Sequence, residues 1–553
     1  MTPDPSHRPL PDPDPDTAFF WQATANGELH ILRCQACHTY IHLPRPGCWS
    51  CGGSDLAPEP VSGRGTVHSY TTTHFPLPGY DPPFAVVLVE LEEQEGLRLI
   101  SNLIDVRPED IEIGLEVEVT FEPATEDMVL PLFRSRRQSR SGGSEHQKRG
   151  APRRSGTPPA QRLSAVRSAT QRPTTRDVAI VGVGYSQIGR DVPRTTGALA
   201  VDACRSALAD AGLTRTDVDG MATYPAGYDS VPVFWVSESL GIARLNWFED
   251  LFGQMPAGIS PVIAAAWAVA EGHCETALTY RSVKRHGPPG LGYGGTGRVG
   301  GDMQFRAPFG DSLTSQWLAM WARRHMHEFG TTEEHLGHIA TTFRHHATMN
   351  PDAPLRDPMT LEDYFASRVV TTPFRLFDCD YPVDGAGAVV ITTLERARDL
   401  PHPPVGVVDG VFATGPRPDW DQWDDLTHMA SRYASERLWQ RTGMSPRDLD
   451  VAEIYDGFSW LALCWLEDLG LCEKGEGGPF VAEGNIALGS TIPTNTHGGS
   501  LSGGRLHAIS HVVECTRQLR GECGERQVVG ARTGIVTSGG GTMAGALLLQ
   551  REP

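Results

Sequence analysis

The run Val178-Ala179-Ile180-Val181-Gly182-Val183-Gly184 has no charged residue and is rich in β-branched side chains, as is typical of a buried strand. Residues 197–211 follow with a helical pattern, and Gly534-Ile535-Val536-Thr537-Ser538-Gly539-Gly540-Gly541 is a second strand near the C-terminus. Between these two strands, short strand-like runs alternate with longer helical stretches. This alternation predicts a fold of α/β layers.

The glycines that end the first run do not form a dinucleotide-binding fingerprint. After Gly182 and Gly184 the next glycine is Gly189, so the spacing Gly-x-Gly-x-x-Gly is not met, and no acidic residue is placed to bind a ribose. We therefore interpret the segment as a glycine-rich turn between a strand and a helix. A nicotinamide cofactor is not expected.

The whole chain has 553 residues, several times the size of a typical domain, so more than one folding unit is expected. Apolar residues make up 39% and charged residues 21%, which excludes a largely disordered chain. The longest apolar run, residues 261–270, is shorter than the roughly 18 residues of a membrane span, and the N-terminus lacks the features of a secretory signal. Seven of the eleven cysteines are scattered, as free thiols in a reducing compartment would be. We predict a cytoplasmic protein without a membrane span.

Residues 135–175 separate two parts of the chain. From Arg134 to Arg176 there are twelve Lys or Arg residues, one acidic residue (Glu145) and almost no large apolar side chains. Such a segment cannot bury enough surface to fold, so we predict a flexible basic linker. The net charge of the whole chain is −19, and the parts outside the linker are more acidic still. We therefore expect no nucleic-acid partner.

The part before the linker has a β-rich pattern. A helical segment is expected within residues 1–33, around Phe19-Phe20-Trp21. Residues 56–134 contain four short runs with strand-like composition, separated by glycines and prolines. The runs are residues 65–71, 84–91, 97–103 and 117–121. This pattern is typical of a small barrel or sandwich.

A cysteine cluster lies within residues 34–55. Cys34 and Cys37 form one Cys-x-x-Cys turn, and Cys48 and Cys51 form a second one after ten intervening residues. Each turn directs two sulfurs to one point, so the two turns complete a tetrahedral thiolate shell with no open position. The spacing predicts a structural Zn²⁺ ion, held in a zinc ribbon, rather than a catalytic one.

Residues 18–134 resemble a bacterial family in which a zinc ribbon precedes an OB-fold and which accompanies acyl-CoA enzymes. The matching residues are Phe20-Trp21, Gly27-Glu28-Leu29, the four cysteines, Pro44-Arg45-Pro46, Ser62-Gly63-Arg64-Gly65-Thr66-Val67, Ser69-Tyr70 and Gly114. The resemblance implies an accessory module that lines or completes an acyl-CoA site, with an acyl-CoA hydratase or dehydrogenase as a further partner. An OB-fold alone also suits single-stranded nucleic acid, but the acidic composition of this part argues against that reading.

Residues 176–553 resemble the thiolase superfamily, and within it the sterol-carrier and lipid-transfer branch. Three segments match the active-site loops of that superfamily in order and spacing, and a fourth matches an internal strand–turn signature. They are Glu453-Ile454-Tyr455-Asp456-Gly457-Phe458, residues 495–507, Thr537-Ser538-Gly539-Gly540-Gly541 and residues 380–388. The resemblance implies a five-layered thiolase-like fold that forms a homodimer and binds acyl-CoA.

The active-site cysteines of thiolases are missing from this chain. The segment that matches the nucleophile loop, residues 252–258, has no cysteine, and the nearest one is Cys274. Thr537 stands at the position of the second thiolase cysteine. Without a thiolate no acyl-enzyme is expected, so ordinary thiolase chemistry is excluded.

The remaining polar residues suit carbon–carbon cleavage without a covalent step. The resemblance places Tyr455 and Arg505 at the two positions that hold the oxyanion in thiolases. Related steroid side-chain retro-aldolases carry tyrosine at both positions, so Arg505 is a departure. We hypothesise that Arg505 stabilises an enolate and lowers the pKa of Tyr455, which then acts as acid and base. His507 is the second predicted proton carrier.

The predicted substrate is a β-hydroxyacyl-CoA, a steroid thioester on resemblance, which the enzyme would cleave into a ketone or aldehyde and a shorter acyl-CoA. CoA therefore enters as part of the substrate. The predicted substrate-binding residues are Asp456, Gly498, Gly499 and Gly540.

Each assignment has a plainer alternative. Tyr455 could pack under Phe458, His507 could satisfy backbone groups at a helix start, and Arg505 could bind CoA phosphates or neutralise Asp456. The whole chain could instead run the aldol condensation, serve as a non-catalytic acyl-CoA-binding subunit, or act as an acyltransferase. The unusual nucleophile of such an acyltransferase would be Ser538, Thr537 or Cys274.

Overall fold

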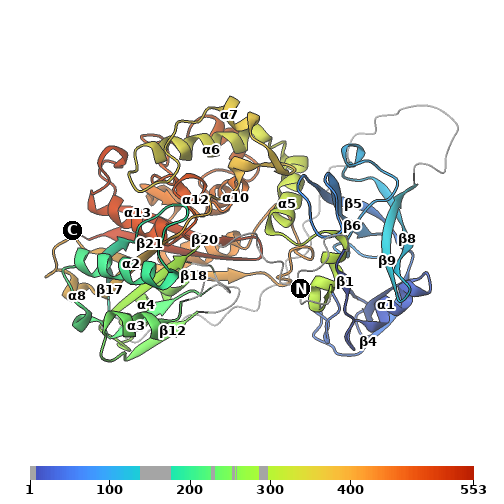
Figure 1. The fold of residues 1–553 in the computed structure, drawn as a ribbon, viewed down its shortest axis with the longest axis horizontal. Coiled ribbons are helices and arrows are strands. Elements are labelled where there is room, and N and C mark those ends of the chain that lie inside the picture. Colours follow the sequence, from blue (N-terminus) through green and yellow to red (C-terminus); the bar gives the residue numbers. More distant parts are fainter. Residues whose placement is uncertain are drawn as a thin grey trace.

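A computed structural model gives the structure of the chain. It describes residues 8–136, 176–225, 231–251, 256, 258–284 and 297–552. These residues form a small β-rich part at the N-terminal end and a larger α/β part (Figure 1). The predicted linker, residues 135–175, begins too early by one residue, because Ser135 still belongs to strand β9 (Met128–Ser135), and residues 137–175 lie outside the described residues.

The cysteine cluster lies on a small three-stranded sheet with the order β3 (Tyr40–Ile41), β2 (Leu29–Cys34) and β4 (Leu56–Val61). A short helix, α1 (Ala18–Ala25), precedes it. The segment predicted as helical is therefore only partly so, because strand β2 begins within it and carries the first cysteine at its end.

The next five strands form the barrel. They are β5 (Arg64–Thr73), β6 (Phe84–Leu91), β7 (Arg98–Ser101), β8 (Glu116–Thr125) and β9 (Met128–Ser135). The ten-residue strand β5 pairs with both β6 and β8, and it shifts register between Val67 and Ser69. A bridge from Leu103 to Phe133 brings the end of β7 against β9 and nearly closes the ring. This arrangement is that of an OB-fold barrel.

The large part is built on one twisted sheet. Within the described residues its order is β12 (Trp247–Asp250), β11 (Gly220–Thr223), β13 (Thr276–Val283), β17 (Gly385–Thr393), β10 (Val178–Tyr185), β18 (Val405–Thr414), β21 (Met543–Arg551), β20 (Thr533–Gly540) and β19 (Val451–Glu453). Strands β10 and β18 pair over only two residue pairs, so two half-sheets meet there. Both strands predicted from the sequence, β10 and β20, lie in this sheet.

The helices around the two half-sheets make five layers. Helices α4 (Ser260–Ala270) and α13 (Ile509–Arg520) contact strands of both halves and form the central layer. Helix α2 (Thr196–Asp210) and helix α3 (Val233–Leu240) cover one outer face. On the other outer face, α9 (Ser431–Thr442) packs on β18 and β21, and α10 (Ser459–Leu469) packs on α9. The order helix, sheet, helix, sheet, helix confirms the predicted five-layered α/β class.

The remaining elements of the described chain connect these layers to each other and to the barrel. They are β1 (Leu10–Pro11), β14 (Arg298–Val299), α5 (Thr314–Phe329), α6 (Glu333–Thr348), α7 (Leu361–Ala366), β15 (Val369–Thr371), β16 (Phe374–Arg375), α8 (Leu394–Ala397), α11 (Gly477–Ala482) and α12 (Gly499–Ser502). None of the helices that the structure describes has both the length and the apolar character to cross a bilayer.

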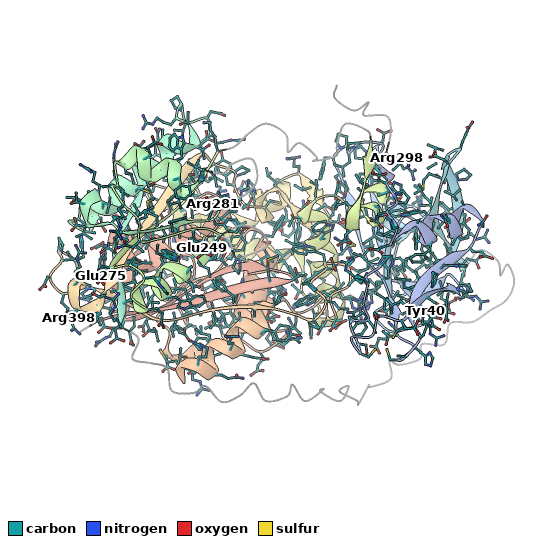
Figure 2. The ribbon with its side chains drawn as sticks, turned by 90° about the horizontal axis from the view of Figure 1, so that it is seen from below. Tyr40, Glu249, Glu275, Arg281, Arg298 and Arg398 are labelled. Atoms are coloured by element: carbon teal, nitrogen blue, oxygen red, sulfur yellow. The ribbon has the colours of Figure 1, made fainter. Side chains whose placement is uncertain are left out.

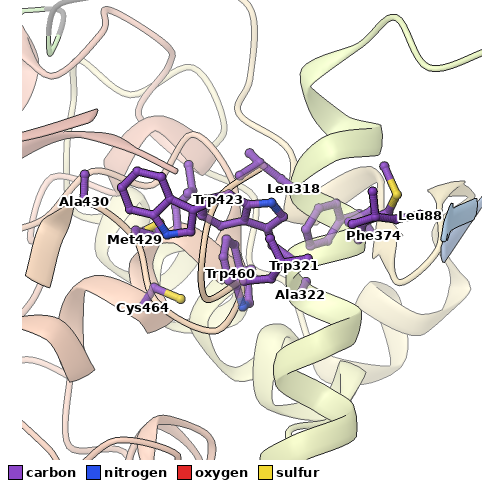
Figure 3. Close-up of a cluster of buried hydrophobic side chains, with 14 of the residues drawn as sticks. Leu88, Leu318, Trp321, Ala322, Phe374, Trp423, Met429, Ala430, Trp460 and Cys464 are labelled. Carbon is purple, nitrogen blue, oxygen red and sulfur yellow. The ribbon is translucent and has the colours of Figure 1, made fainter. Parts of the chain in front are cut away.

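The barrel docks on the α/β part of its own chain. Strand β15 extends the barrel sheet by pairing Thr371 with Thr73 of β5. Apolar side chains continue across the junction: Leu88 of the barrel belongs to the same buried cluster as Trp321 and Trp460 (Figure 3). Burial of such large aromatic side chains is the main stabilising term at a contact of this kind.

Buried polar contacts add specificity to this junction. Trp21 Nε1 donates to Gln304 Oε1 at 2.6 Å, and Arg98 Nη1 donates to the carbonyl of Trp423 at 2.6 Å. Arg98 is 3% exposed, so its guanidinium needs these acceptors, together with its ion pair to Glu90 at 3.0 Å. The two parts therefore form one body, joined by a shared cluster of apolar side chains and by buried polar contacts that cross the interface.

Candidate active site

The three predicted loops come together at one end of the β19–β20 pair. The amide N–H of Tyr455, two residues after β19, donates to Thr537 Oγ1 at 2.9 Å in β20. Asn495 clamps the second loop (residues 495–507) to the first, because its Oδ1 accepts from the Ile454 N–H at 2.7 Å and its Nδ2 donates to the Ile454 carbonyl at 2.8 Å. The segments that are distant in sequence therefore form one structural unit.

Tyr455 lies half-buried between the central layer and the loops. Its ring lies over Gly457, where an added Cβ would come within 3.0 Å of the phenol oxygen. Burial raises the pKa of Tyr455 above its ordinary value, the charge of Asp380 raises it further, and Arg505 only partly opposes them. The predicted lowering of this pKa is therefore wrong. The reason is that desolvation of the phenol outweighs one guanidinium, and Tyr455 is a neutral hydrogen-bond donor at pH 7.

Arg505 faces the same region from the loop between α12 and α13. Its Nη1 lies 3.7 Å from Asp380 Oδ1, and its amide N–H donates to the carbonyl of Tyr381 at 2.9 Å. The side chain is 35% exposed, so a ligand can reach the guanidinium. Arg505 therefore forms an ion pair with Asp380, whereas the sequence suggested Asp456 as its neighbour.

His507 is held by an arginine from the other half of the sheet. Arg281 of β13, 1% exposed, directs Nε and Nη2 at His507 Nδ1, at 3.2 and 3.0 Å. Burial lowers the pKa of His507 well below its ordinary value, and Arg281 and Arg505 lower it further. Because Nδ1 accepts from Arg281, the imidazole is neutral and carries its proton on Nε2.

Asp456, predicted to bind substrate, lies beneath the loops. It is fully buried, and its carboxylate accepts from the N–H groups of Ser500 and Leu501 at 2.7 and 3.2 Å and from His511 Nε2 at 3.0 Å. These contacts hold the start of α12. With both oxygens engaged, Asp456 acts on the site by positioning the loop that carries Arg505.

The predicted glycines sit where the loops pack tightly. Gly499 has φ +61°, and an added Cβ would lie 2.0 Å from Asp456 Oδ2. Added Cβ atoms at Gly498 and Gly540 would lie 2.6 Å from Ala347 Cβ and Leu461 Cδ2 respectively. The glycines therefore permit close packing of loop backbone.

A buried polar network supports the loops from below. His497 Nδ1 contacts Glu453 Oε2 at 2.9 Å, and Thr496 Oγ1 bridges Glu453 and Glu514 at 2.8 Å each. Arg526 pairs with both oxygens of Glu514 at 2.8 and 3.0 Å. Although burial opposes ionisation, this hydrogen-bonded guanidinium holds the pKa of Glu514 at about 2. These hydrogen bonds tie the loop that carries Thr496 and His497 to Glu453 of β19 and Glu514 of α13, and so fix the loop position.

The alternative nucleophiles lack the surroundings that activation requires. Thr537 Oγ1 accepts the Tyr455 N–H, and burial raises the pKa of Cys274 to about 12. Cys274 precedes β13, whereas Arg281 lies seven residues further along, about 23 Å away at strand rise. Ser538 is fully buried in β20. Residues 252–255 and 257 of the thiolase nucleophile loop lie outside the described residues.

Three side chains at the site were not assigned from the sequence. Asp380 stands in a quoted signature without a role, Tyr224 directly follows parallel strand β11, and Arg281 lies within a strand. The Arg281 guanidinium lies 5.8 Å from the Tyr224 ring centroid, and Figure 2 labels Arg281 in the α/β part. The sequence offered one sign of Arg281, because it is the one charged residue in the strand Thr276–Val283 and charged side chains are rarely buried unless they are paired.

The four cysteines predicted to bind zinc do converge. Their sulfurs lie within 4.8 Å of one another, with 3.6 Å between Cys34 and Cys51 and 3.5 Å between Cys37 and Cys48. Four thiolates around a tetrahedral Zn²⁺ with bonds of 2.3 Å would be about 3.8 Å apart. The group could therefore hold a metal ion of this kind.

Comparison with known proteins agrees with both parts of the chain. A thiolase C-terminal domain-like family model matches residues 417–549, and a model of the ChsH2 C-terminal OB-fold domain matches residues 58–122. These matches confirm the predicted thiolase-like fold and OB-fold.

Similar proteins define the class more narrowly. The chain is 36% identical over 387 residues to the steroid side-chain-cleaving aldolase of Thermomonospora curvata, which covers 65% of this chain and 96% of that protein. It is also 36% identical over 388 residues to the 17-hydroxy-3-oxo-4-pregnene-20-carboxyl-CoA lyase of Mycobacterium tuberculosis. That match covers 67% of this chain and 98% of the lyase. The solved structure of an Ltp2-ChsH2(DUF35) aldolase matches with 33% identity and a TM-score of 0.63, covering 68% of this chain and 98% of that one.

Fold, site and relatives together define a thiolase-like carbon–carbon lyase that carries its own OB-fold module. Within that class, the chain belongs to the family of steroid side-chain-cleaving aldolases.

Proposed function

We propose that this enzyme cleaves the Cα–Cβ bond of a β-hydroxyacyl-CoA thioester by a non-covalent retro-aldol reaction, and that the acyl group is a steroid side chain. The observation that carries the proposal is the pairing of Tyr455 and Arg505 around Asp380, in a thiolase-like site where Thr537 replaces a cysteine. This arrangement offers donors for an oxyanion and no activated sulfur.

The reaction needs three events. A base accepts the proton of the β-hydroxyl group as the oxygen electrons form a carbonyl. The electrons of the Cα–Cβ bond move onto the thioester carbonyl and form an enolate. A proton then returns to Cα, which releases the ketone and the shorter acyl-CoA. Donors directed at the enolate oxygen typically contribute about 3–4 kcal/mol each.

The geometry supports a division of these tasks. Arg505, permanently protonated and 35% exposed, stabilises the enolate oxygen. Tyr455 is neutral because burial raises its pKa, so it donates a hydrogen bond and supplies the proton to Cα. His507 offers Nε2–H as a neutral donor, since Arg281 occupies Nδ1.

The substrate class follows from the relatives. A 17-hydroxy-3-oxo-4-pregnene-20-carboxyl-CoA carries its hydroxyl group on the carbon β to the thioester. Retro-aldol cleavage of that thioester yields the 17-ketone and propanoyl-CoA. We propose a substrate of this type for the present chain.

Product analysis tests the proposal. Purified protein incubated with this steroid thioester is expected to release one 17-ketone for each propanoyl-CoA, while the intact mass of the protein stays unchanged. Binding without product release would favour the non-catalytic subunit, and an acyl adduct would favour the acyltransferase. A straight-chain β-hydroxyacyl-CoA is the matched control for the steroid requirement.

The cysteine cluster is proposed to hold a structural Zn²⁺ ion. The ligands would be Cys34, Cys37, Cys48 and Cys51, and four thiolates leave no position for a substrate. The metal would stabilise the ribbon that precedes the barrel and take no part in the reaction.

A homodimer through the α/β part is also proposed. Among the strands that the structure describes, β12 pairs only with β11, so one edge is open for a second copy. Phe248 on β12 is 50% exposed, and Phe234 and Trp267 nearby are 60% and 45% exposed. Antiparallel pairing of β12 with its copy would bury these side chains, and analytical ultracentrifugation would detect it.

The cellular setting is a further proposal. None of the eleven cysteines, all of which the structure describes, forms a disulfide, and this suits the reducing cytoplasm. Because the resembling accessory modules accompany acyl-CoA enzymes, we propose an acyl-CoA hydratase or dehydrogenase as a partner. Co-purification of tagged protein with such an enzyme would test this.

A further inference from the structure

Asp380 lies where the active-site loops meet. Its amide N–H donates to the carbonyl of Gly457 at 3.1 Å, two residues from Tyr455. The next residue, Tyr381, donates to the carbonyl of Ser500 at 3.0 Å and accepts from the Arg505 N–H at 2.9 Å. Three backbone hydrogen bonds thus fix this segment between the loop of Tyr455 and the loop of Arg505.

The carboxylate of Asp380 is poorly satisfied. Its side chain is 15% exposed, and its recorded ion pair, with Arg505, spans 3.7 Å. Among the described residues no hydrogen-bond donor is recorded on its oxygens. Buried carboxylates are normally hydrogen-bonded, so this one has accepting capacity to spare.

Asp378, two residues earlier, provides the contrast. Its oxygens accept from the Tyr364 hydroxyl at 2.8 Å, the Arg375 N–H at 2.7 Å and the Ser459 hydroxyl, and it is fully buried. The carboxylate of Asp378 is therefore occupied by structural hydrogen bonds, whereas that of Asp380 can still accept a hydrogen bond in the site.

Burial raises the pKa of Asp380 to about 6, Asp456 raises it as well, and Arg505 opposes them. A carboxylate with this pKa is ionised at pH 7 and is a stronger base than an ordinary one. Its charge also helps to keep the neighbouring Tyr455 protonated. The two side chains therefore differ in protonation state, as an acid and a base must.

We propose that Asp380 is the general base that accepts the proton of the substrate's β-hydroxyl group. The inference deepens the proposed function and rests on it. The hydroxyl proton moves to the Asp380 carboxylate as the Cα–Cβ bond breaks, and Tyr455 gives its proton to Cα of the enolate. Return of the proton from Asp380 to the Tyr455 phenolate restores both groups. The net change is transfer of one proton from oxygen to carbon, with no oxidation or reduction.

The test compares Asp380→Asn with the wild type on the steroid thioester. The amide keeps the shape and cannot accept the proton, so kcat/KM at pH 7 is expected to fall by at least about 100-fold. In the pH profile of the wild type, kcat/KM is expected to decrease below about pH 6 with the slope of a single protonation. This acid limb of the profile should be absent from the residual activity of Asp380→Asn. Four other titratable or charged groups lie around this part of the site. Arg505 is permanently charged, Asp456 is fully hydrogen-bonded, the pKa of Tyr455 is raised, and that of His507 is lowered well below its ordinary value.

Asp378→Asn is the matched control, because burial also raises the pKa of Asp378 to about 6. This variant is expected to keep the acid limb even where its stability falls. Formate is expected to restore part of the activity of Asp380→Gly, a rescue that a purely structural role would not show. Suppose that the wild type cleaves the thioester and that Asp380→Asn keeps the acid limb, with kcat/KM within threefold of the wild type. That result would overturn only the base assignment. Absence of cleavage by the wild type would overturn the proposed function, and the base assignment with it.

Discussion

Arg281 and His507 lie 226 residues apart in sequence and share a two-nitrogen contact, in which Nε and Nη2 of the arginine approach Nδ1 of the histidine at 3.2 and 3.0 Å. The contact joins strand β13 of one half-sheet to the loop before α13, the central helix that contacts both half-sheets. It fixes the histidine tautomer and suppresses its protonation. His507 is therefore a neutral donor of fixed orientation, whereas the sequence alone suggested a titrating proton carrier.

Replacing Arg281 tests this role. Arg281→Met leaves Nδ1 without its donor and removes a charge that lowers the pKa of His507, so the imidazole can turn or tautomerise. We expect kcat to fall about 10- to 100-fold through misalignment. The pKa of His507, followed by NMR, should rise. Arg281→Lys keeps the charge, so its kcat should lie between those of the wild type and Arg281→Met. A kcat of Arg281→Met equal to that of the wild type would contradict the assigned role.

Tyr455→Phe removes only the phenol oxygen. Because Tyr455 is assigned as the proton donor to Cα, turnover of the steroid thioester is expected to fall by at least about 100-fold. The melting temperature should change little, since the ring still packs over Gly457. Near-normal turnover would remove Tyr455 from the mechanism.

Cys34→Ser tests the metal site. Cys34 is fully buried at the end of β2, so loss of its thiolate should abolish stoichiometric zinc and destabilise the ribbon and barrel. Metal content by mass spectrometry is the measurement. Cys472→Ser, outside the cluster, should keep one zinc per chain. A zinc-free wild-type protein that is folded would refute the site.

Glu514→Gln tests the network under the loops. With Arg526 left without its carboxylate, the free energy of unfolding at pH 7 is expected to fall by about 3–5 kcal/mol. The folded pKa of about 2 lies below the ordinary value near 4.3, so this stabilisation is present above about pH 4.3 and is lost as pH falls toward 2. Urea unfolding should therefore show wild type and variant converging between pH 4 and pH 2. A constant difference down to pH 2 would contradict the assignment.

Docking of the barrel on its own chain predicts the behaviour of a cut chain. A protease site inserted at residue 150 would separate the two parts covalently while leaving the interface around Trp321 and Arg98 intact. The two fragments should co-elute in size exclusion and keep activity. Arg98→Ala in the same background should weaken the association, because it removes a buried cross-interface donor. Separate elution of the fragments without that substitution would contradict a stable interface.

Much of this fold is local in origin. The uncharged run at Val178 became the central strand β10, and the run at Phe84 became β6 with the same bounds. The cysteine spacing also brought four sulfurs together, because each turn is a short-range structure. Hydrophobic periodicity and turn chemistry act over a few residues, so the strands and the cysteine cluster could be predicted from the sequence.

The chemistry of the site depended on contacts that no local pattern encodes. Position in a motif suggested Tyr455 and Arg505, but the direction of the tyrosine pKa shift depended on burial and on Asp380, 75 positions earlier. The partner of His507 lay 226 positions away in a strand of the other half-sheet. Desolvation and long-range pairing are properties of the packed molecule, and they raise the pKa of Tyr455 where the sequence suggested that it is lowered.

Exchange of hydrogen for deuterium at Cα of propanoyl-CoA tests the enolate most directly. In deuterated water with the 17-ketone present, the wild type is expected to exchange the Cα hydrogens, because the protonation of Cα is reversible. Tyr455→Phe and Arg505→Met should abolish exchange while still binding the thioester. Turnover without exchange, or a propanoyl group found covalently on the protein, would contradict an enolate held by phenol and guanidinium.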